Sequence, residues 1–412
     1  MKRTILTLVV ASISFGVFAQ QVDSVITQGG VNDVYYSFKN GVTSEVDRMT
    51  WDIALNTAAF DASILINENA GVELYSYSTD VADWDMVDTS GFDFVNIYNS
   101  PKSWENGAFV RLASGHPDYG WGTYNMGTHN VAGSRIFLLK DRNDDLHQVV
   151  IEDMSAAGVY TIKIGDIGGA NTKTVKVNKK DAAYEGKNFV HVDIATQVVL
   201  NNEPLRKDWD LLFTKYIDLV PTRTGDFLPY TLSGVKINKG YEVAERKDLP
   251  VTSNDTSALD WGTNITEIGS DWKSFDFASF SYLMTDSLTY FVRGDGGAVW
   301  KIYFTNYKGS STGGYYFTTE QLRTNANVKD LRKISTRVYP NPSNGRFTIE
   351  NNERSTVAAS LMSLTGTVLE SYNLPPNSAM TINATRIVSG MYILSIRSGD
   401  GDKISTQRIV IK

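Results

Sequence analysis

The sequence contains no cysteine. Disulfide bonds, thiol nucleophiles, cysteine-based zinc sites and iron–sulfur clusters are therefore excluded. The folded state has to be stabilised by burial of apolar side chains and by pairing of strands.

Basic residues are outnumbered by acidic ones. The chain has 39 Lys and Arg against 46 Asp and Glu, which gives a formal net charge of −7. Proteins that bind nucleic acid gather an excess of basic side chains to meet the phosphate backbone. We therefore expect no nucleic-acid partner.

Long apolar runs are absent except at the start of the chain. Met1, Lys2 and Arg3 precede an apolar run over residues 5–18, and Ala19 offers a small residue for a signal peptidase. The run is shorter than the roughly 20 apolar residues that a membrane span needs. We predict a signal peptide at residues 1–19.

Signatures of common enzyme classes are missing as well. The sequence has no Gly-x-Ser-x-Gly elbow, no phosphate-binding glycine loop with Lys and no His-Glu-x-x-His motif. We expect no enzyme, no catalytic residue and no metal site held by protein ligands alone.

Aromatic residues are abundant, with 21 Tyr, 18 Phe and 8 Trp. Aromatic and β-branched side chains suit the pleated, half-buried surface of a sheet. The composition therefore favours a mainly β fold, which we expect to consist of two tandem antiparallel β domains followed by a small C-terminal β-sandwich.

The two tandem domains are predicted from an internal repeat. Residues 50–55 (TWDIAL) match residues 208–213 (DWDLLF), and residues 121–126 (WGTYNM) match residues 272–277 (WKSFDF). A hairpin over residues 136–150 matches one over residues 289–303. We place copy one at residues 20–180 and copy two at 181–323, and we expect the repeated Trp-Asp pair to have a scaffold role.

A polar linker over residues 324–336 precedes the last domain, at residues 337–412. Two prolines and a glycine stand before an alternating strand at residues 346–350, and further short strands follow at 358–363, 368–372, 380–383, 391–396 and 405–411. This spacing of short strands and turns is typical of a small sandwich.

Residues 337–412 closely resemble the type A C-terminal sorting domain of the Bacteroidetes type IX secretion system. The matching residues are Tyr339, Pro340, Asn341, Pro342, Gly366, Gly390, Tyr392 and Lys412. The resemblance implies that the type IX machinery is a partner. It also implies export through the periplasm, so that the protein is secreted or held on the outer cell surface.

The repeat, over about residues 30–323, resembles the HmuY-like family of secreted haem-binding proteins. Members that bind haem clamp the iron between two His or Met side chains from loops over an apolar cleft. This resemblance implies haem, or a haemoprotein, as a partner of copy one, with His116, His129 and Met126 as the axial candidates. Copy two has Phe280 at the position that matches His129.

An alternative stays open: a metal-free extracellular module that binds glycan or protein through aromatic-rich loops. Haem binding requires the candidate ligands to face one apolar cleft, whereas an interaction module requires an exposed aromatic patch, which we would look for on copy two. We expect the two other histidines, His147 and His191, to be ordinary strand residues.

Overall fold

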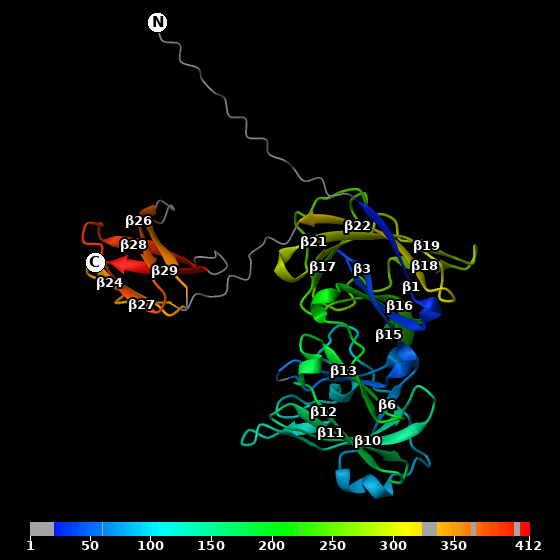
Figure 1. The fold of residues 1–412 in the computed structure, drawn as a ribbon. Coiled ribbons are helices and arrows are strands. Elements are labelled where there is room, and N and C mark those ends of the chain that lie inside the picture. The colour runs from blue at the N-terminus through cyan, green and yellow to red at the C-terminus, as the bar shows by residue number, and fades with distance from the viewer. Residues whose placement is uncertain are drawn as a thin grey trace. The chain divides into compact units, whose positions relative to one another are not determined.

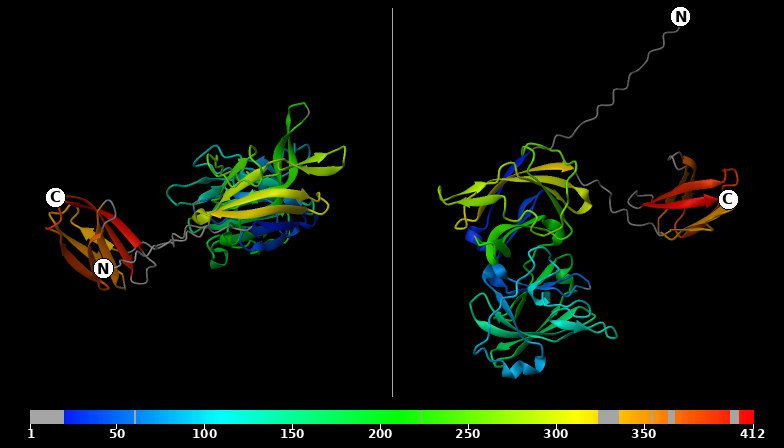
Figure 2. Two further views of the ribbon diagram at one scale, coloured as in Figure 1. Left: turned by 90° about the horizontal axis from the view of Figure 1, so that it is seen from above. Right: turned by 180° about the vertical axis from the view of Figure 1, so that it is seen from behind.

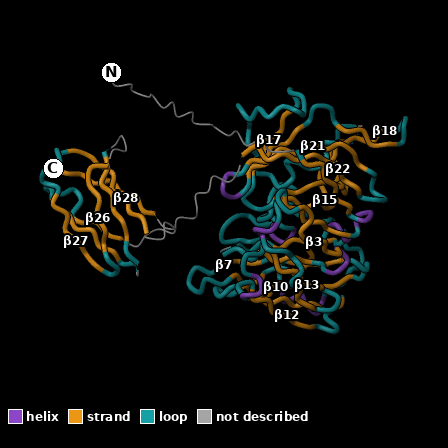
Figure 3. Tube along the Cα trace, turned by 45° about the horizontal axis from the view of Figure 1, so that its top comes forward, coloured by secondary structure: helices purple, strands orange, loops and turns teal. Residues whose placement is uncertain are grey.

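The computed structural model describes residues 20–59, 61–222, 224–323, 336–353, 355–363, 368–398 and 404–412. The chain divides between Thr324 and Asn325 into two compact units. Both consist mainly of antiparallel sheets, and the larger unit also has a few short 3-10 helices (Figures 1 and 3), which confirms the mainly β fold class. The expected signal peptide, Gly366 and nearly all of the expected linker lie outside the described residues.

The larger unit contains two lobes. Lobe one is built from β4 (Ile53–Asn56), β5 (Ile64–Ile66), β6 (Glu73–Ser78), β7 (Gly122–Tyr124), β8 (Val131–Gly133), β9 (Ile136–Lys140), β10 (Leu146–Met154), β11 (Val159–Asp166), β12 (Lys173–Asn178), β13 (Phe189–Asp193) and β14 (Val198–Leu200). Its 3-10 helices are η3 (Glu68–Ala70), η4 (Val81–Met86), η5 (Ala108–Val110) and η6 (Ala182–Tyr184).

Lobe two combines the start of the described chain with a later segment. Its strands are β1 (Gln21–Ile26), β2 (Asn32–Ser37), β3 (Gly41–Asp47), β15 (Leu211–Pro221), β16 (Phe227–Ile237), β17 (Glu242–Arg246), β18 (Lys273–Asp276), β19 (Ser281–Met284), β20 (Thr289–Arg293), β21 (Val299–Tyr307) and β22 (Gly314–Arg323). Its 3-10 helices are η1 (Gln28–Gly30), η7 (Arg206–Asp208) and η8 (Asp295–Gly297), and η2 (Arg48–Thr50) leads from it into lobe one.

The two lobes have the same sheet order. In lobe one, β14-β13-β4-β5 form one sheet, and β12, β11, β10, β9 and β6 are neighbours in the other. In lobe two, the corresponding sheets run β3-β2-β15-β16 and β1-β22-β21-β20-β17. The repeat is therefore present in the fold, but lobe two takes its last three strands from the start of the chain.

This pairing corrects the expected copy boundary at residue 180. Strand β13, which was assigned to copy two, pairs with β4 of lobe one. Strands β1 and β2, which were assigned to copy one, pair with β22 and β15 of lobe two. A sequence repeat shows which segments are alike, but it does not show which strands pair, because pairing is a long-range choice.

The Trp-Asp pair has the scaffold role that the repeat suggested, and its contacts are duplicated. Asp52 accepts a hydrogen bond from the Ile194 amide at 2.7 Å, and Asp210 accepts one from the Phe38 amide at 2.6 Å. Asn67 donates to the carbonyls of Arg48 and Trp51, and Asn238 donates to those of Arg206 and Trp209. Each carboxylate thus fixes the end of the strand beside its own.

Each lobe has its own apolar core between its two sheets. The matched tryptophans Trp121 and Trp272 are fully buried in these cores, and each indole donates to a backbone carbonyl, of Ala62 and Gly269 respectively. A third cluster, which includes Trp51, Trp104 and Trp209, is lined by the four-stranded sheets of both lobes. The lobes therefore share buried surface.

The smaller unit has a three-stranded and a four-stranded sheet around one core. Its strands are β23 (Thr336–Tyr339), β24 (Arg346–Asn351), β25 (Val357–Met362), β26 (Val368–Leu374), β27 (Ser378–Asn383), β28 (Gly390–Ser398) and β29 (Ile404–Ile411). They agree closely with the strands expected from the turn residues. Among the described residues, no helix is long and apolar enough to cross a bilayer.

The duplicated carboxylates predict a difference in stability. Asp52 also binds the Arg142 guanidinium at 2.6 Å, whereas Asp210 accepts from the Tyr241 hydroxyl at 2.6 Å. Losing Asp52 removes one of the two carboxylates that pair with the Arg142 guanidinium, the other being Asp193 at 2.7 Å, and so leaves a largely buried cation with less counter-charge. Losing Asp210 removes a hydrogen bond from an uncharged hydroxyl and leaves no charge behind. We expect Asp52→Ala to destabilise the larger unit more than Asp210→Ala.

Urea unfolding followed by tryptophan fluorescence measures this difference, because all eight tryptophans precede residue 324. Equal losses of unfolding free energy in Asp52→Ala and Asp210→Ala would show that the ion pair between Asp52 and Arg142 adds no stability.

Candidate functional site

The β15–β16 hairpin of lobe two extends beyond its sheet. Both strands have 11 residues, and their inner ends are buried while their outer ends are exposed. Apolar and aromatic side chains occupy the exposed end: Leu219, Phe227, Leu228 and Tyr230. Exposed apolar side chains gathered on one element are typical of an interaction surface.

The short β18–β19 hairpin carries a second aromatic group. Phe277 and Phe280 lie in its turn with 75% and 80% of their surface exposed. Phe275 contacts both rings and also the ring of Tyr282. The Asp276 carboxylate holds the turn by accepting hydrogen bonds from the backbone amides of Ala278 and Ser279. Both hairpins project from lobe two in the left view of Figure 2.

A groove of about 430 Å³ lies between these two hairpins. We call it the hairpin groove. It is lined by Lys215, Tyr230, Thr231, Leu232, Ser233, Ser270, Lys273, Phe275, Tyr282, Tyr307 and Ser310. Its volume is in the range of small-ligand sites, which is about 300–1,000 Å³.

Lys273 is the most perturbed group in the hairpin groove. Its ammonium lies 4.1 Å from the centroid of the Trp272 ring and donates to the Ser233 carbonyl at 2.6 Å. Burial lowers the pKa of Lys273 to about 7, and the negative charge of Asp271 opposes this shift only in part.

A second, larger groove also borders the β15–β16 hairpin. It measures about 900 Å³ and is lined by residues 95–102, Arg111 and Leu112 of lobe one and by Ile217, Asp218, Leu219 and Phe227 of lobe two. The β15–β16 hairpin therefore borders two grooves, and one of them is shared by both lobes.

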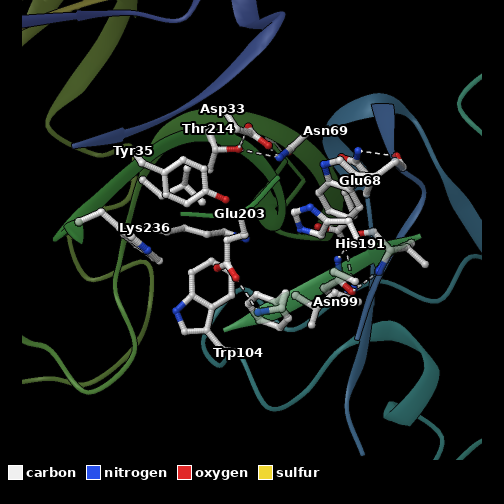
Figure 4. A pocket seen from close by; sticks show the side chains of 18 residues that line it. Asp33, Tyr35, Glu68, Asn69, Asn99, Trp104, His191, Glu203, Thr214 and Lys236 are labelled. Carbon is white, nitrogen blue, oxygen red and sulfur yellow. Dashed lines mark hydrogen bonds between the residues drawn. The ribbon is translucent and has the colours of Figure 1, made fainter. Parts of the chain in front are cut away.

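A small cavity of about 60 Å³ lies between the four-stranded sheets and is lined by both aromatic and polar side chains (Figure 4). Asp33 accepts from Thr214 at 2.5 Å, and Glu203 accepts from the Phe189 amide at 2.6 Å. Burial raises the pKa of Glu203 to about 8 and lowers the pKa of His191 to about 4. The cavity has room for a few water molecules and is too small for an organic ligand.

The structure brings the two expected haem ligands near one aromatic ring. The Tyr124 hydroxyl lies 2.7 Å from Nδ1 of His129, and the ring centroids of Tyr124 and His116 are 5.4 Å apart. Both histidines are exposed, and Met126 is 76% exposed. None of the three lines the grooves or the cavity described above.

The other two histidines lie in strands, as expected. His147 in β10 pairs with the Asp141 carboxylate at 3.0 Å, and His191 in β13 stacks on Trp51 with a centroid distance of 4.2 Å. Phe280 and His129 both have positive φ, 49° and 59°, at the end of the turns of equivalent hairpins. Phe280 directly precedes β19, and Asn130 separates His129 from β8. The repeat therefore matched these two positions correctly.

Sequence reasoning missed the hairpin groove. A turn signal, Thr222 and Gly225 between apolar runs, could have indicated the long β15–β16 hairpin. Nothing in the sequence indicated that Lys215 and Lys273 line the same groove, because they are far apart in sequence and lie on different hairpins.

In the smaller unit, the described sorting residues join its first and last strands. The Asn341 side chain accepts from the Val410 amide at 2.9 Å and donates to the Arg408 carbonyl at 2.6 Å. The amide of Lys412 donates to the Ser343 carbonyl at 2.8 Å. The Tyr392 hydroxyl of β28 donates to the carbonyl of Val388, which lies just before this strand begins at Gly390. The Tyr-Pro-Asn-Pro segment, residues 339–342, is thereby held against β29.

The fold and grooves define a mainly β protein with two hairpins that expose apolar side chains. Residues 337–412 match the family model of the secretion system C-terminal sorting domain. The protein is therefore exported by type IX secretion to the cell surface or the extracellular space.

Two solved structures are distantly similar to this chain. One is PorZ, a bacterial surface component of the type IX secretion system of Porphyromonas gingivalis: identity is 11%, the TM-score is 0.17, and the match covers 70% of this chain and 44% of that one. The other is the BSP domain of a biofilm associated protein: identity is 11%, the TM-score is 0.16, and the match covers 98% of this chain and 68% of that one. This chain thus spans under half of the PorZ chain, and neither likeness carries an argument about function. No curated protein matches the chain.

The lowered pKa of Lys273 predicts a pH dependence. Between pH 7 and 10.5 the unfolded chain binds a proton at this lysine that the folded chain does not bind, so stability rises with pH across that window. We expect Lys273→Met to be more stable than the wild type at pH 7, and the difference to shrink toward pH 10.5.

Denaturant unfolding at a series of pH values measures this. Lys163→Met is the matched control, because Lys163 also lies 4.1 Å from the centroid of a tryptophan ring, that of Trp84, but outside the groove. If the free energy of unfolding depends on pH in the same way in the wild type and in Lys273→Met, the lowered pKa of Lys273 is contradicted.

Proposed function

We propose that residues 20–323 act outside the cell as a metal-free binding module, and that the β15–β16 and β18–β19 hairpins form its ligand-binding surface. The observation that carries this proposal is the exposure of Phe277 and Phe280 at the tip of a two-stranded hairpin. Aromatic residues are enriched where proteins bind their partners and dominate the energetics there.

The contrast between equivalent hairpins supports the proposal. The β7–β8 turn of lobe one carries Met126, Thr128 and His129, whereas the β18–β19 turn of lobe two carries Phe277 and Phe280. Asn125 and Asp276 hold the two turns in similar ways, each accepting from two amides of its own turn. Two repeats that had come to bind different ligands would differ in this way: they would keep the same turn scaffold and change the side chains at its tip.

We further propose binding without catalysis. The lining of the hairpin groove contains no carboxylate, and that of the larger groove contains one, Asp218. General acid–base hydrolysis typically needs two positioned proton-transfer groups.

We predict that removing the aromatic side chains from the β18–β19 turn weakens ligand binding and leaves the stability of the fold unchanged. We expect the mature chain, residues 20–412, to be retained on at least one immobilised ligand from a panel of cellulose, chitin, xylan, alginate, collagen and fibrinogen. Changing both Phe277 and Phe280 to Ala is expected to weaken this retention at least tenfold, because two rings are lost from the contact surface. Their exposure means that the melting temperature stays within about 2 °C.

Met126→Ala is the control, since it also removes an exposed side chain from an equivalent turn. Equal retention of the phenylalanine double variant and the wild type, or no retention on any ligand, would overturn the proposal.

Haem binding through lobe one is a second proposal, and it rests on the resemblance to HmuY-like proteins and on the nearness of His116 and His129 to Tyr124. The two histidines fit haem poorly. Both are exposed, and the Tyr124 hydroxyl already hydrogen-bonds to one ring nitrogen of His129. Ligands as large as haem are normally enclosed by apolar side chains.

Haemin titration followed by Soret absorbance tests this second proposal. If it holds, the wild type gives a saturable band shift that His116→Ala and His129→Ala each abolish. Absence of a saturable shift in the wild type would reject haem binding and leave the metal-free module in place.

A further inference from the structure

The hairpin groove contains two lysines without a carboxylate partner. Among the described residues, neither Lys215 nor Lys273 has an acidic oxygen within 4.0 Å of its ammonium. Their hydrogen bonds go to backbone carbonyls: Lys215 donates to Gly29 at 3.4 Å and Lys273 to Ser233 at 2.6 Å. By contrast, the buried Lys301 of the same lobe pairs with Glu320 at 2.8 Å.

We infer that the hairpin groove binds an acidic sugar chain, whose carboxylates pair with Lys215 and Lys273 and whose rings stack on Tyr230 and Phe275. This inference rests on the proposed function and names the ligand class of that surface.

Charge is the first argument for an anionic ligand. The whole chain has a net charge of −7, yet this groove is lined by two lysines and by no acidic residue. A partly desolvated ammonium gains more from an added counter-ion than one in bulk water, because the local dielectric constant is lower. An anionic ligand would supply the counter-ion that the fold does not provide.

The rest of the lining favours a sugar over an acidic peptide. Four of the eleven lining residues are aromatic, four carry an aliphatic hydroxyl, and only Leu232 is aliphatic. Sugar rings present C–H faces that pack on aromatic rings and hydroxyls that exchange hydrogen bonds with Ser and Thr. A peptide groove would instead need apolar pockets to hold anchoring side chains.

A glycine keeps Lys215 in place. Gly30 has φ +89°, and a Cβ atom on it would lie 2.4 Å from Cε and 2.5 Å from Nζ of Lys215. Any other residue at this position would displace the lysine, so Gly30 leaves the space that the ammonium occupies at the groove. Gly30 acts here as a positioning residue.

Isothermal titration calorimetry of the mature chain, residues 20–412, tests the inference. The probes are oligogalacturonate, alginate oligomers and sialyllactose, together with a carboxyl-reduced, neutral oligogalacturonate. We expect at least one acidic probe to bind, its neutral counterpart to bind at least tenfold more weakly, and added salt to weaken the acidic interaction. Lys215→Gln and Lys273→Gln are each expected to weaken acidic binding about tenfold, while Lys163→Gln leaves it unchanged.

Four outcomes would overturn the inference: no acidic probe binds, charged and neutral sugars bind equally, the two lysine variants bind like the wild type, or oligoglutamate competes as well as the sugar. If retention of the chain on an immobilised ligand still depends on Phe277 and Phe280, the proposed function remains valid, with a ligand other than an acidic sugar. A Gly30→Ala variant that folds, by its melting temperature, and loses affinity for the acidic probe alone would support the positioning of Lys215.

Discussion

The larger unit depends on one repeated constraint, the hydrogen bond that a backbone amide at the end of a strand donates to an aspartate carboxylate of the neighbouring strand. Asp52 binds the Ile194 amide and Asp210 binds the Phe38 amide. In each lobe this bond joins two strands that are more than a hundred residues apart in sequence. Because a buried carboxylate without a donor is costly, each lobe is stable only when its distant strand is in place.

For lobe two, the distant strand comes from the start of the described chain. Residues 20–47 supply β1, which pairs with the last strand β22, and β2 and β3, which complete the sheet of β15 and β16. Both terminal strands of the larger unit are thereby paired in lobe two, which carries the β15–β16 and β18–β19 hairpins. If these hairpins bind the proposed ligand, their ordered base lowers the conformational entropy that is lost on binding.

The lobes keep their shared interior and differ at their surface. Trp121 and Trp272 occupy equivalent buried positions, and the strand order is the same. The differences are in the charged partner of the scaffold aspartate, in the length of the hairpin that follows it, and in the tips of the equivalent turns. Packing restricts interior positions strongly, whereas exposed turns are free to change. Export to the cell surface through the sorting domain would place those turns where external ligands can reach them.

The sequence by itself determined the mainly β class, the repeated Trp-Asp and Trp motifs, the main hairpins and the C-terminal sandwich. These features depend on local alternation, turn residues and short motifs, which are visible along the chain. Only the tertiary structure decided that β1–β3 complete lobe two, that His116 and His129 lie beside Tyr124 in solvent, and that Lys215 and Lys273 meet in one groove. Each of these depends on contacts between residues far apart in sequence, and such contacts are chosen by burial and strand pairing across the whole unit, which no local pattern records.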